Sequence, residues 1–199
     1  MICWKTLSNK CSLLLLLITL VVTVAKADSS EDLISFSQKT YGSLVVLDVN
    51  QAAGAVSASK QFQEIFDFEE FSSLCFQDVL PKMNDVEKSE VTKVFREVFF
   101  RNFAKNIKGL SQKKINKPKY TLLEPQGDSE VIQIEGPTEA GQSIIHFYLK
   151  HKTQPKLVDL SVNGALLSRN YRGSFNKIHR MRGYQGLIER LKQTQASLK

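Results

Sequence analysis

Histidine is the side chain most often used for acid–base chemistry near neutral pH, and this chain of 199 residues contains three. His146 lies in an apolar run, His151 lies beside lysines, and His179 lies in a basic stretch. None has the spacing of a metal-binding pair, and the sequence contains no G-x-S-x-G, G-x-x-x-x-G-K-[ST] or H-E-x-x-H motif. The residues therefore predict neither a catalytic centre nor a metal or cofactor site.

Asp159 and Cys75 are the remaining candidates for reactive groups. Asp159 could pair with His146 across adjacent strands, but a carboxylate of this kind more often makes a structural hydrogen bond than acts as a general base. Cys75 shares a predicted helical face with Phe68 and Phe71. We therefore expect Cys75 to be a small buried apolar residue rather than a reactive thiol.

The first residues are typical of a signal peptide. Two lysines precede a largely apolar run from Leu13 to Val24, which ends in Ala25-Lys26-Ala27, a small-x-small cleavage pattern. The run falls well short of the roughly 20 residues that a bilayer core requires. We expect cleavage before Asp28, export from the cytoplasm and a single domain over residues 28–199.

The net charge of the chain is +7, and its basic residues are clustered. One cluster lies between Lys88 and Lys119, and a second comprises Arg169, Arg172, Lys177, Arg180 and Arg182. Because an exported protein rarely meets nucleic acid, we expect no nucleic-acid partner. An anionic membrane surface or an acidic partner is the expected counterpart, and a solvated helix face is an equally good interpretation.

Apolar periodicity predicts helices near 31–42, at 62–80, from 84 to about 107, at 166–179 and at 184–198. Pro81 is expected to end the second helix, and Asn84 with Glu87 to form a capping box at the start of the third. Gly109 is expected to stop that third helix. The segment 44–59 fits helix, strand or loop equally well and is left open.

Between the helical regions the apolar period changes to two, which predicts strands at 119–124, 130–135, 143–150 and 156–162. Turn residues such as Pro125-Gln126-Gly127-Asp128 separate neighbouring strands. The expected fold is therefore α+β, with N-terminal helices, a four-stranded antiparallel sheet and C-terminal helices.

The segment DLSVNGALLSRNYRGSFNKIHRMRGYQGLIERL resembles the closing motif of the MlaC family, also called the toluene-tolerance or ABC-transporter auxiliary family. The matching residues are Asp159, Gly164, Asn170, Tyr171, Arg172, Phe175, Gly183, Gly186 and Leu187. Upstream, Phe66, Asp67 and Phe68 resemble the start of a family helix, so that the likeness covers about Phe62 to the end. The chain departs from the pattern at Asn163, where the family usually has an acid, and at Leu166, where it has a serine.

This resemblance implies a periplasmic phospholipid shuttle without a cofactor. Such a protein holds a diacyl phospholipid in an apolar cavity between sheet and helices. It exchanges this cargo with an outer-membrane lipoprotein complex and an inner-membrane ABC transporter that carries an MCE-domain subunit. Two alternatives stay open: a small periplasmic enzyme on a pocketed α+β scaffold, and a carrier of another lipid such as a hopanoid.

An acyl chain of about sixteen carbons costs on the order of 10 kcal/mol to expose to water, so a carrier needs an apolar lining beyond its ordinary core. The candidate lining residues are Phe95, Phe99, Phe103, Ile132, Ile134, Ile145, Phe147, Leu149, Leu160 and Val162. An aromatic stripe at helical spacing is also the usual pattern of plain core, and this second interpretation stays open.

The other motif residues are expected to be structural. Gly164 should allow the sharp passage from the last strand to the helix, where a side chain would be strained. Asn170 and Tyr171 should lock that helix onto the sheet, and Gly183 and Gly186 should bracket the turn into the final helix.

Overall fold

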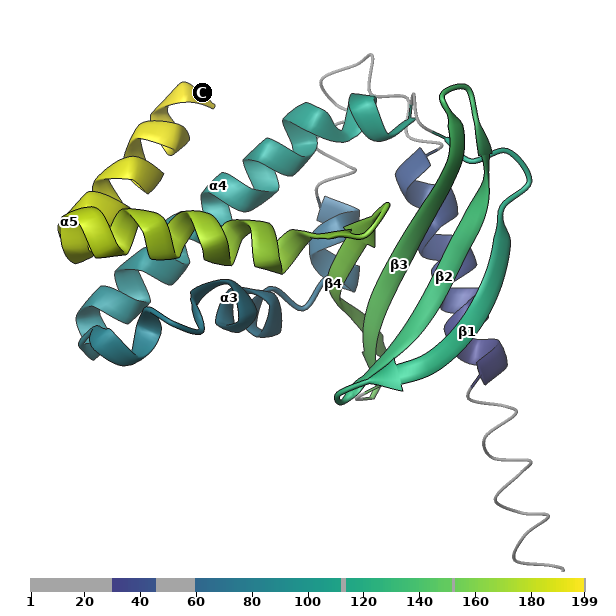
Figure 1. Cartoon of the computed structure of the whole chain (residues 1–199), viewed down its shortest axis with the longest axis horizontal. Coiled ribbons are helices and arrows are strands. Elements are labelled where there is room, and N and C mark those ends of the chain that lie inside the picture. The colour runs from purple at the N-terminus through teal and green to yellow at the C-terminus, as the bar shows by residue number, and fades with distance from the viewer. Residues whose placement is uncertain (1–29, 46–59, 112–113, 152, 199) are drawn as a thin grey trace, which may run out of the picture.

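The computed structural model describes residues 30–45, 60–111, 114–151 and 153–198 (Figure 1). The signal peptide and cleavage site predicted from the sequence lie outside these residues, as does most of the open segment 44–59. None of the helices in the described ranges is long and apolar enough to cross a membrane.

A five-stranded antiparallel sheet forms one part of the molecule, with its strands in the order β1-β2-β3-β4-β5. The strands are β1 (Lys119–Gln126), β2 (Ser129–Thr138), β3 (Gly141–His151), β4 (Pro155–Val162) and β5 (Ala165–Leu166). The four predicted strands are confirmed as a meander, and the two-residue β5 was not predicted. It exists because Asn163 (φ 50°) and Gly164 (φ 81°) form a two-residue turn that folds β5 back onto β4.

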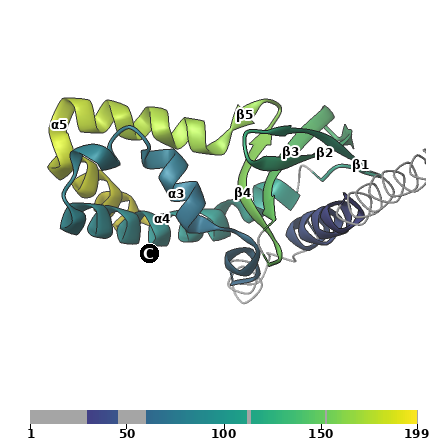
Figure 2. The ribbon, with the colours of Figure 1, turned by 90° about the horizontal axis from the view of Figure 1, so that it is seen from below.

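A helix at 30–45, the purple ribbon in Figures 1 and 2, lies against one face of the sheet. Three further helices form a second part beside β4: α3 (Phe68–Phe76), α4 (Asp85–Ser111) and α5 (Leu167–Ser197). In this part α5 packs against both α3 and α4. The weak helical signal near 31–42 is thus confirmed.

The single helix predicted over 62–80 is wrong, because the chain leaves the helical conformation at Phe66 and Asp67. A short helix at 60–65 ends at Phe66, which forms a bridge with Leu157 of β4. The Asp67 amide donates to the Leu157 carbonyl at 2.8 Å, and the Asp67 carboxylate then caps α3 by accepting from the Glu70 amide at 3.1 Å. Pro81 lies beyond α3, in the 3₁₀ turn Leu80–Lys82.

The capping box at the start of α4 is confirmed, since Asn84 and Glu87 each accept the other's backbone N–H at 2.9 and 3.0 Å. Gly109 does not stop this helix, which continues to Ser111. The two helices predicted after the sheet run end to end as α5, and Gly183 separates them with a non-helical backbone (φ 62°, ψ −164°). A single glycine at that position lets the chain change direction without a loop.

Aromatic rings from α3, α4 and α5 fill the space between these helices. Phe95 is fully buried, and its ring centroid lies 5.1 Å from those of both Tyr171 and Phe175. Phe71 and Phe99 approach to 4.9 Å in the same cluster. Cys75 is also buried here, as its apolar surroundings in the sequence predicted. The helical part of the protein is therefore solid core.

Candidate functional site

An apolar cavity of about 220 Å³ lies between the sheet, the helix at 30–45 and the second half of α4. Its walls are formed by Tyr41, Leu44, Val45, Phe103, Ile145, Phe147, Leu160 and Val162, and its other lining residues are Thr138, Ala140, Gln142, Ser143 and Asn163. Ile145 and Phe147 share one face of β3 because strand side chains alternate, and they lie directly opposite Val162 and Leu160 of β4. The register of two strands thus builds one wall.

Five of the ten predicted lining residues line this cavity: Phe103, Ile145, Phe147, Leu160 and Val162. The other five, Phe95, Phe99, Ile132, Ile134 and Leu149, are fully or almost fully buried and do not line it. Phe95 and Phe99 belong instead to the aromatic cluster between the helices. The hollow is therefore displaced along α4 from the position that the phenylalanine stripe suggested, because the first turns of the stripe pack against α3 and α5.

Sequence reasoning missed the wall contributed by the helix at 30–45. The buried residues Leu33, Ser37, Tyr41 and Leu44 recur at helical spacing on one face of it. That spacing could have identified this wall, but Ser37 and Tyr41 carry hydroxyl groups, and they weaken the apolar pattern. Thr138 gave no signal because it lies at the end of β2, and Asn163 was noted only as a departure from the MlaC pattern.

Among the described residues that line the cavity, none has a charged side chain. The Tyr41 hydroxyl oxygen accepts a hydrogen bond from the Ile115 amide at 2.8 Å, and burial raises the pKa of Tyr41. Tyr120 meets Tyr41 edge to face at 6.5 Å, and burial raises the pKa of Tyr120 to about 12. Both phenols are therefore neutral near pH 7, and the cavity is suited to an apolar ligand whose polar end meets uncharged hydroxyl and amide groups.

The possible pairing of Asp159 with His146 does not occur. His146 lies opposite Ser161 in the sheet, with Nδ1 at 3.2 Å from Ser161 Oγ and Nε2 at 3.1 Å from Gln133 Oε1. Asp159 is instead 3 % exposed, and its Oδ1 accepts from the Leu160 amide at 2.8 Å and from the Ser168 amide at 3.2 Å. Burial raises the pKa of Asp159, and these bonds fix the start of α5.

The tail motif holds helices together rather than locking a helix onto the sheet. The Asn170 side chain is exposed, whereas Tyr171 packs edge to face on Phe71 of α3 and on Phe95 of α4. Phe175 stacks on Phe76 at 4.5 Å. The expected docking of Asn170 and Tyr171 on the sheet is therefore wrong, because α5 leaves the sheet at once and crosses the other helices.

Gly186 is required by the bend at Gly183. A Cβ atom at Gly186 would lie 2.1 Å from the Cβ of Arg182, which is closer than real side-chain atoms approach. His179 lies near this bend, and the His151 side chain is outside the described part of the chain. Within the described residues, no group of histidine, cysteine and acidic side chains could hold a metal ion.

Comparison with known proteins matches this chain to a protein family and to solved structures. The family model described as MlaC protein matches residues 47–193. A solved structure of a phospholipid-binding protein from Ralstonia solanacearum in complex with a phospholipid shares the fold, with a TM-score of 0.60 at 14 % identity. The match covers 88 % of this chain and 97 % of that one. A search of curated protein sequences finds no match. Because the family model spans most of the chain and includes the tail motif, this protein belongs to the MlaC family.

Proposed function

We propose that this protein is a phospholipid carrier, and that its cavity holds hydrocarbon from a diacyl phospholipid. The cavity between the helix at 30–45 and strands β3 and β4, whose described lining residues are all uncharged, carries the proposal. Its apolar walls suit acyl chains, and its hydroxyl and amide groups can hydrogen-bond a headgroup or ester without a fixed charge. Membership of the MlaC family and the phospholipid held by the Ralstonia protein of the same fold support it.

The same proposal includes the location and route of the carrier. The N-terminal residues have the pattern of a signal peptide cleaved before Asp28, and the carrier would then act in the periplasm. We propose that it exchanges lipid with an outer-membrane lipoprotein complex and with an inner-membrane ABC transporter that carries an MCE-domain subunit. We assign it no catalytic step, since His146 and Asp159 both lie outside the cavity.

A cavity-filling substitution tests lipid binding. Ile145→Trp places an indole in the cavity, whereas Ile144→Trp places the same group on the opposite face of β3, where Ile144 is 39 % exposed. Protein purified without detergent is analysed by mass spectrometry for bound lipid. Wild type and Ile144→Trp should carry diacyl phospholipid, and Ile145→Trp should carry much less.

Two outcomes would contradict this function. If repeated preparations of folded wild-type protein contained no lipid, the carrier function itself would be contradicted. Equal loading of both tryptophan variants would place the ligand somewhere other than this cavity. A hopanoid or another polyisoprenoid in the extract, in place of phospholipid, would keep the carrier and change its cargo.

A further inference from the structure

The end of the helical part that lies farthest from the sheet carries an unusual surface, which we call the elbow: residues 80–86 and 176–183. It comprises the bend of α5 at Gly183 and the turn that leads into α4 (Figures 1 and 2). Met181 is 73 % exposed and Val86 is 78 % exposed. Apart from Ile144, these are the only large hydrophobic side chains in the described residues that are mostly open to solvent. Two of the three thus lie at one end of the molecule.

Basic residues flank Met181 on both sides, at Arg180 and Arg182, whereas Val86 lies between the acids Asp85 and Glu87. A groove of about 340 Å³ beside the bend is lined by Asp78, Val79, Lys82, Asn176, His179 and Arg180. Its one acid is already neutralised, because Arg172 donates to both oxygens of Asp78 at 2.6 Å. Lys82 also helps to lower the pKa of the Asp78 carboxyl through its charge, and among the described residues neither Lys82 nor Arg180 forms a salt bridge of its own. The groove therefore carries a net positive charge.

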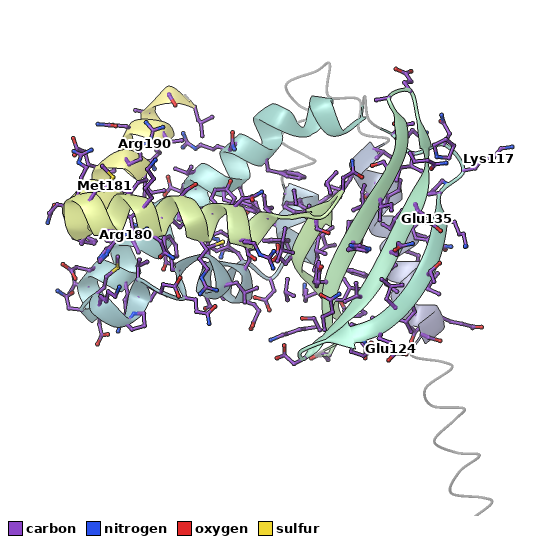
Figure 3. The ribbon with its side chains drawn as sticks, in the orientation of Figure 1. Lys117, Glu124, Glu135, Arg180, Met181 and Arg190 are labelled. Atoms are coloured by element: carbon purple, nitrogen blue, oxygen red, sulfur yellow. The ribbon has the colours of Figure 1, made fainter. Side chains whose placement is uncertain are left out.

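Figure 3 shows Arg180 and Met181 on the bend of α5, with Arg190 near them on the following turns. An apolar tip flanked by basic residues matches the chemistry of a bilayer surface, where the apolar group enters the headgroup layer and the cations meet lipid phosphates. A protein partner is favoured less, because protein interfaces concentrate buried aromatic anchors, and the described residues expose no aromatic side chain at the elbow.

We propose that the elbow docks the protein on an anionic membrane surface, with lipid phosphate in the groove of Lys82 and Arg180 and Met181 among the headgroups. The cavity lies at the other end of the molecule, near Phe103 and the β2–β3 turn. Docking through the elbow therefore holds the carrier at a membrane while its cavity stays free for exchange. This proposal rests on the export that is part of the proposed function, because it requires the protein to meet a membrane surface.

Vesicle co-sedimentation tests the docking surface. Protein recovered from the periplasmic fraction of a Gram-negative host is mixed with vesicles of phosphatidylethanolamine and phosphatidylglycerol, and separately with phosphatidylcholine vesicles. We expect binding to the anionic vesicles only, and its loss at high salt. Lys82→Glu combined with Arg180→Glu should weaken binding by roughly 25-fold or more, taking about fivefold for each basic residue near an anionic surface.

The matched control reverses the same number of charges elsewhere. Lys39→Glu combined with Lys117→Glu changes the net charge equally on exposed residues of the sheet part, where Figure 3 places Lys117. This control should bind within about threefold of wild type. Met181→Trp supplies a direct reporter, because Trp4 is the only tryptophan in the sequence and leaves with the signal peptide. Its emission should shift to shorter wavelength on anionic vesicles, and that of Ile144→Trp should not.

Equal loss of binding in both charge variants would overturn the proposal, because net charge alone would then explain the effect. The proposal would also fail if folded wild-type protein did not bind anionic vesicles. Binding to immobilised polyglutamate through Lys82 and Arg180, without binding to vesicles, would have the same consequence, because it would indicate an acidic protein partner in place of a membrane. Lipid content measured on the same preparations separates this failure from that of the carrier function. An elbow variant that still carries phospholipid leaves the cavity proposal intact.

Discussion

Asp159 should hold α5 in place as a hydrogen-bond acceptor and not as a charge. Its buried carboxylate accepts two backbone N–H groups, one of them from Ser168 at the start of α5. Asp159→Ala removes this acceptor from both backbone N–H groups and from the Ser168 side chain, which also hydrogen-bonds the carboxylate. Asp159→Asn keeps one oxygen as an acceptor, removes the charge and replaces the second carboxylate oxygen by an NH2 donor.

The structure sets the size of the two effects. Leaving one buried donor unsatisfied costs about 1–3 kcal/mol, and losing a helix cap costs about 1 kcal/mol. The two donors overlap with the cap, so Asp159→Ala should lower the free energy of unfolding by about 2–4 kcal/mol. Asp159→Asn should stay within about 1 kcal/mol of wild type near neutral pH, because the carboxylate is buried at a cost that the amide avoids.

The pH dependence has a definite sign. Burial raises the pKa of Asp159 above the ordinary 3.8, so the folded protein holds this proton more tightly than the unfolded chain does. The resulting stabilisation is fully present below pH 3.8 and is lost as the pH rises through the folded-state pKa. The free energy of unfolding of wild type, relative to that of Asp159→Asn, should therefore fall as the pH rises from 3.8 to the folded-state pKa, and should level off above it.

Urea unfolding followed by circular dichroism, repeated at several pH values, measures both effects. Asn170→Ala serves as a control, since the Asn170 side chain is exposed on the same helix and should change stability little. If Asp159→Asn proves as destabilising as Asp159→Ala at neutral pH, the charge is what α5 requires. The reasoning from hydrogen bonds would then be refuted.

Three further substitutions or modifications test other parts of the fold. Phe95→Ala should lower the free energy of unfolding by about 3–5 kcal/mol in urea titrations, because Phe95 is fully buried, and the half-buried Phe103→Ala should cost less. Gly183→Ala should cost about 1–3 kcal/mol of thermal stability, since φ of 62° with ψ of −164° strains any side chain; equal melting temperatures would contradict this. Cys75 should resist iodoacetamide in the native protein and react in urea, because burial raises the pKa of its thiol, and peptide mapping would detect any native modification.

Elements with a long, clean period could be predicted from the sequence. The four long strands have apolar residues at alternate positions and turn residues between them, and the α4 cap has a local signature in Asn84 and Glu87. The break at Phe66 was not predictable in this way, because the reason for it lies far away in the sequence. The Leu157 carbonyl accepts a hydrogen bond from the Asp67 amide. This pairing interrupts the helix although the apolar helical pattern continues before and after Phe66.

The cavity shows the same limit. Spacing alone makes three residues of α4 equally good candidates for the lining: Phe95, Phe99 and Phe103. In the structure α3 and α5 cover Phe95 and Phe99, whereas Phe103 lies beside the cavity. Which part of a stripe is covered depends on where α5 crosses α4. That crossing is set by Asp159 and by the bend at Gly183, neither of which affects the apolar period of α4.

The separation of solid core from cavity has an energetic reason. An unfilled apolar cavity of 220 Å³ would cost up to about 5 kcal/mol, at roughly 24 cal/mol per Å³, and less here because its mouth is open to water. A domain of ordinary stability tolerates such a defect only if its remaining core is tightly packed. The aromatic cluster of α3, α4 and α5 supplies that packing at a distance from the cavity, so emptying the cavity need not loosen the helices. Ligand that fills the cavity should accordingly raise the melting temperature of the whole protein, since it binds the folded state alone.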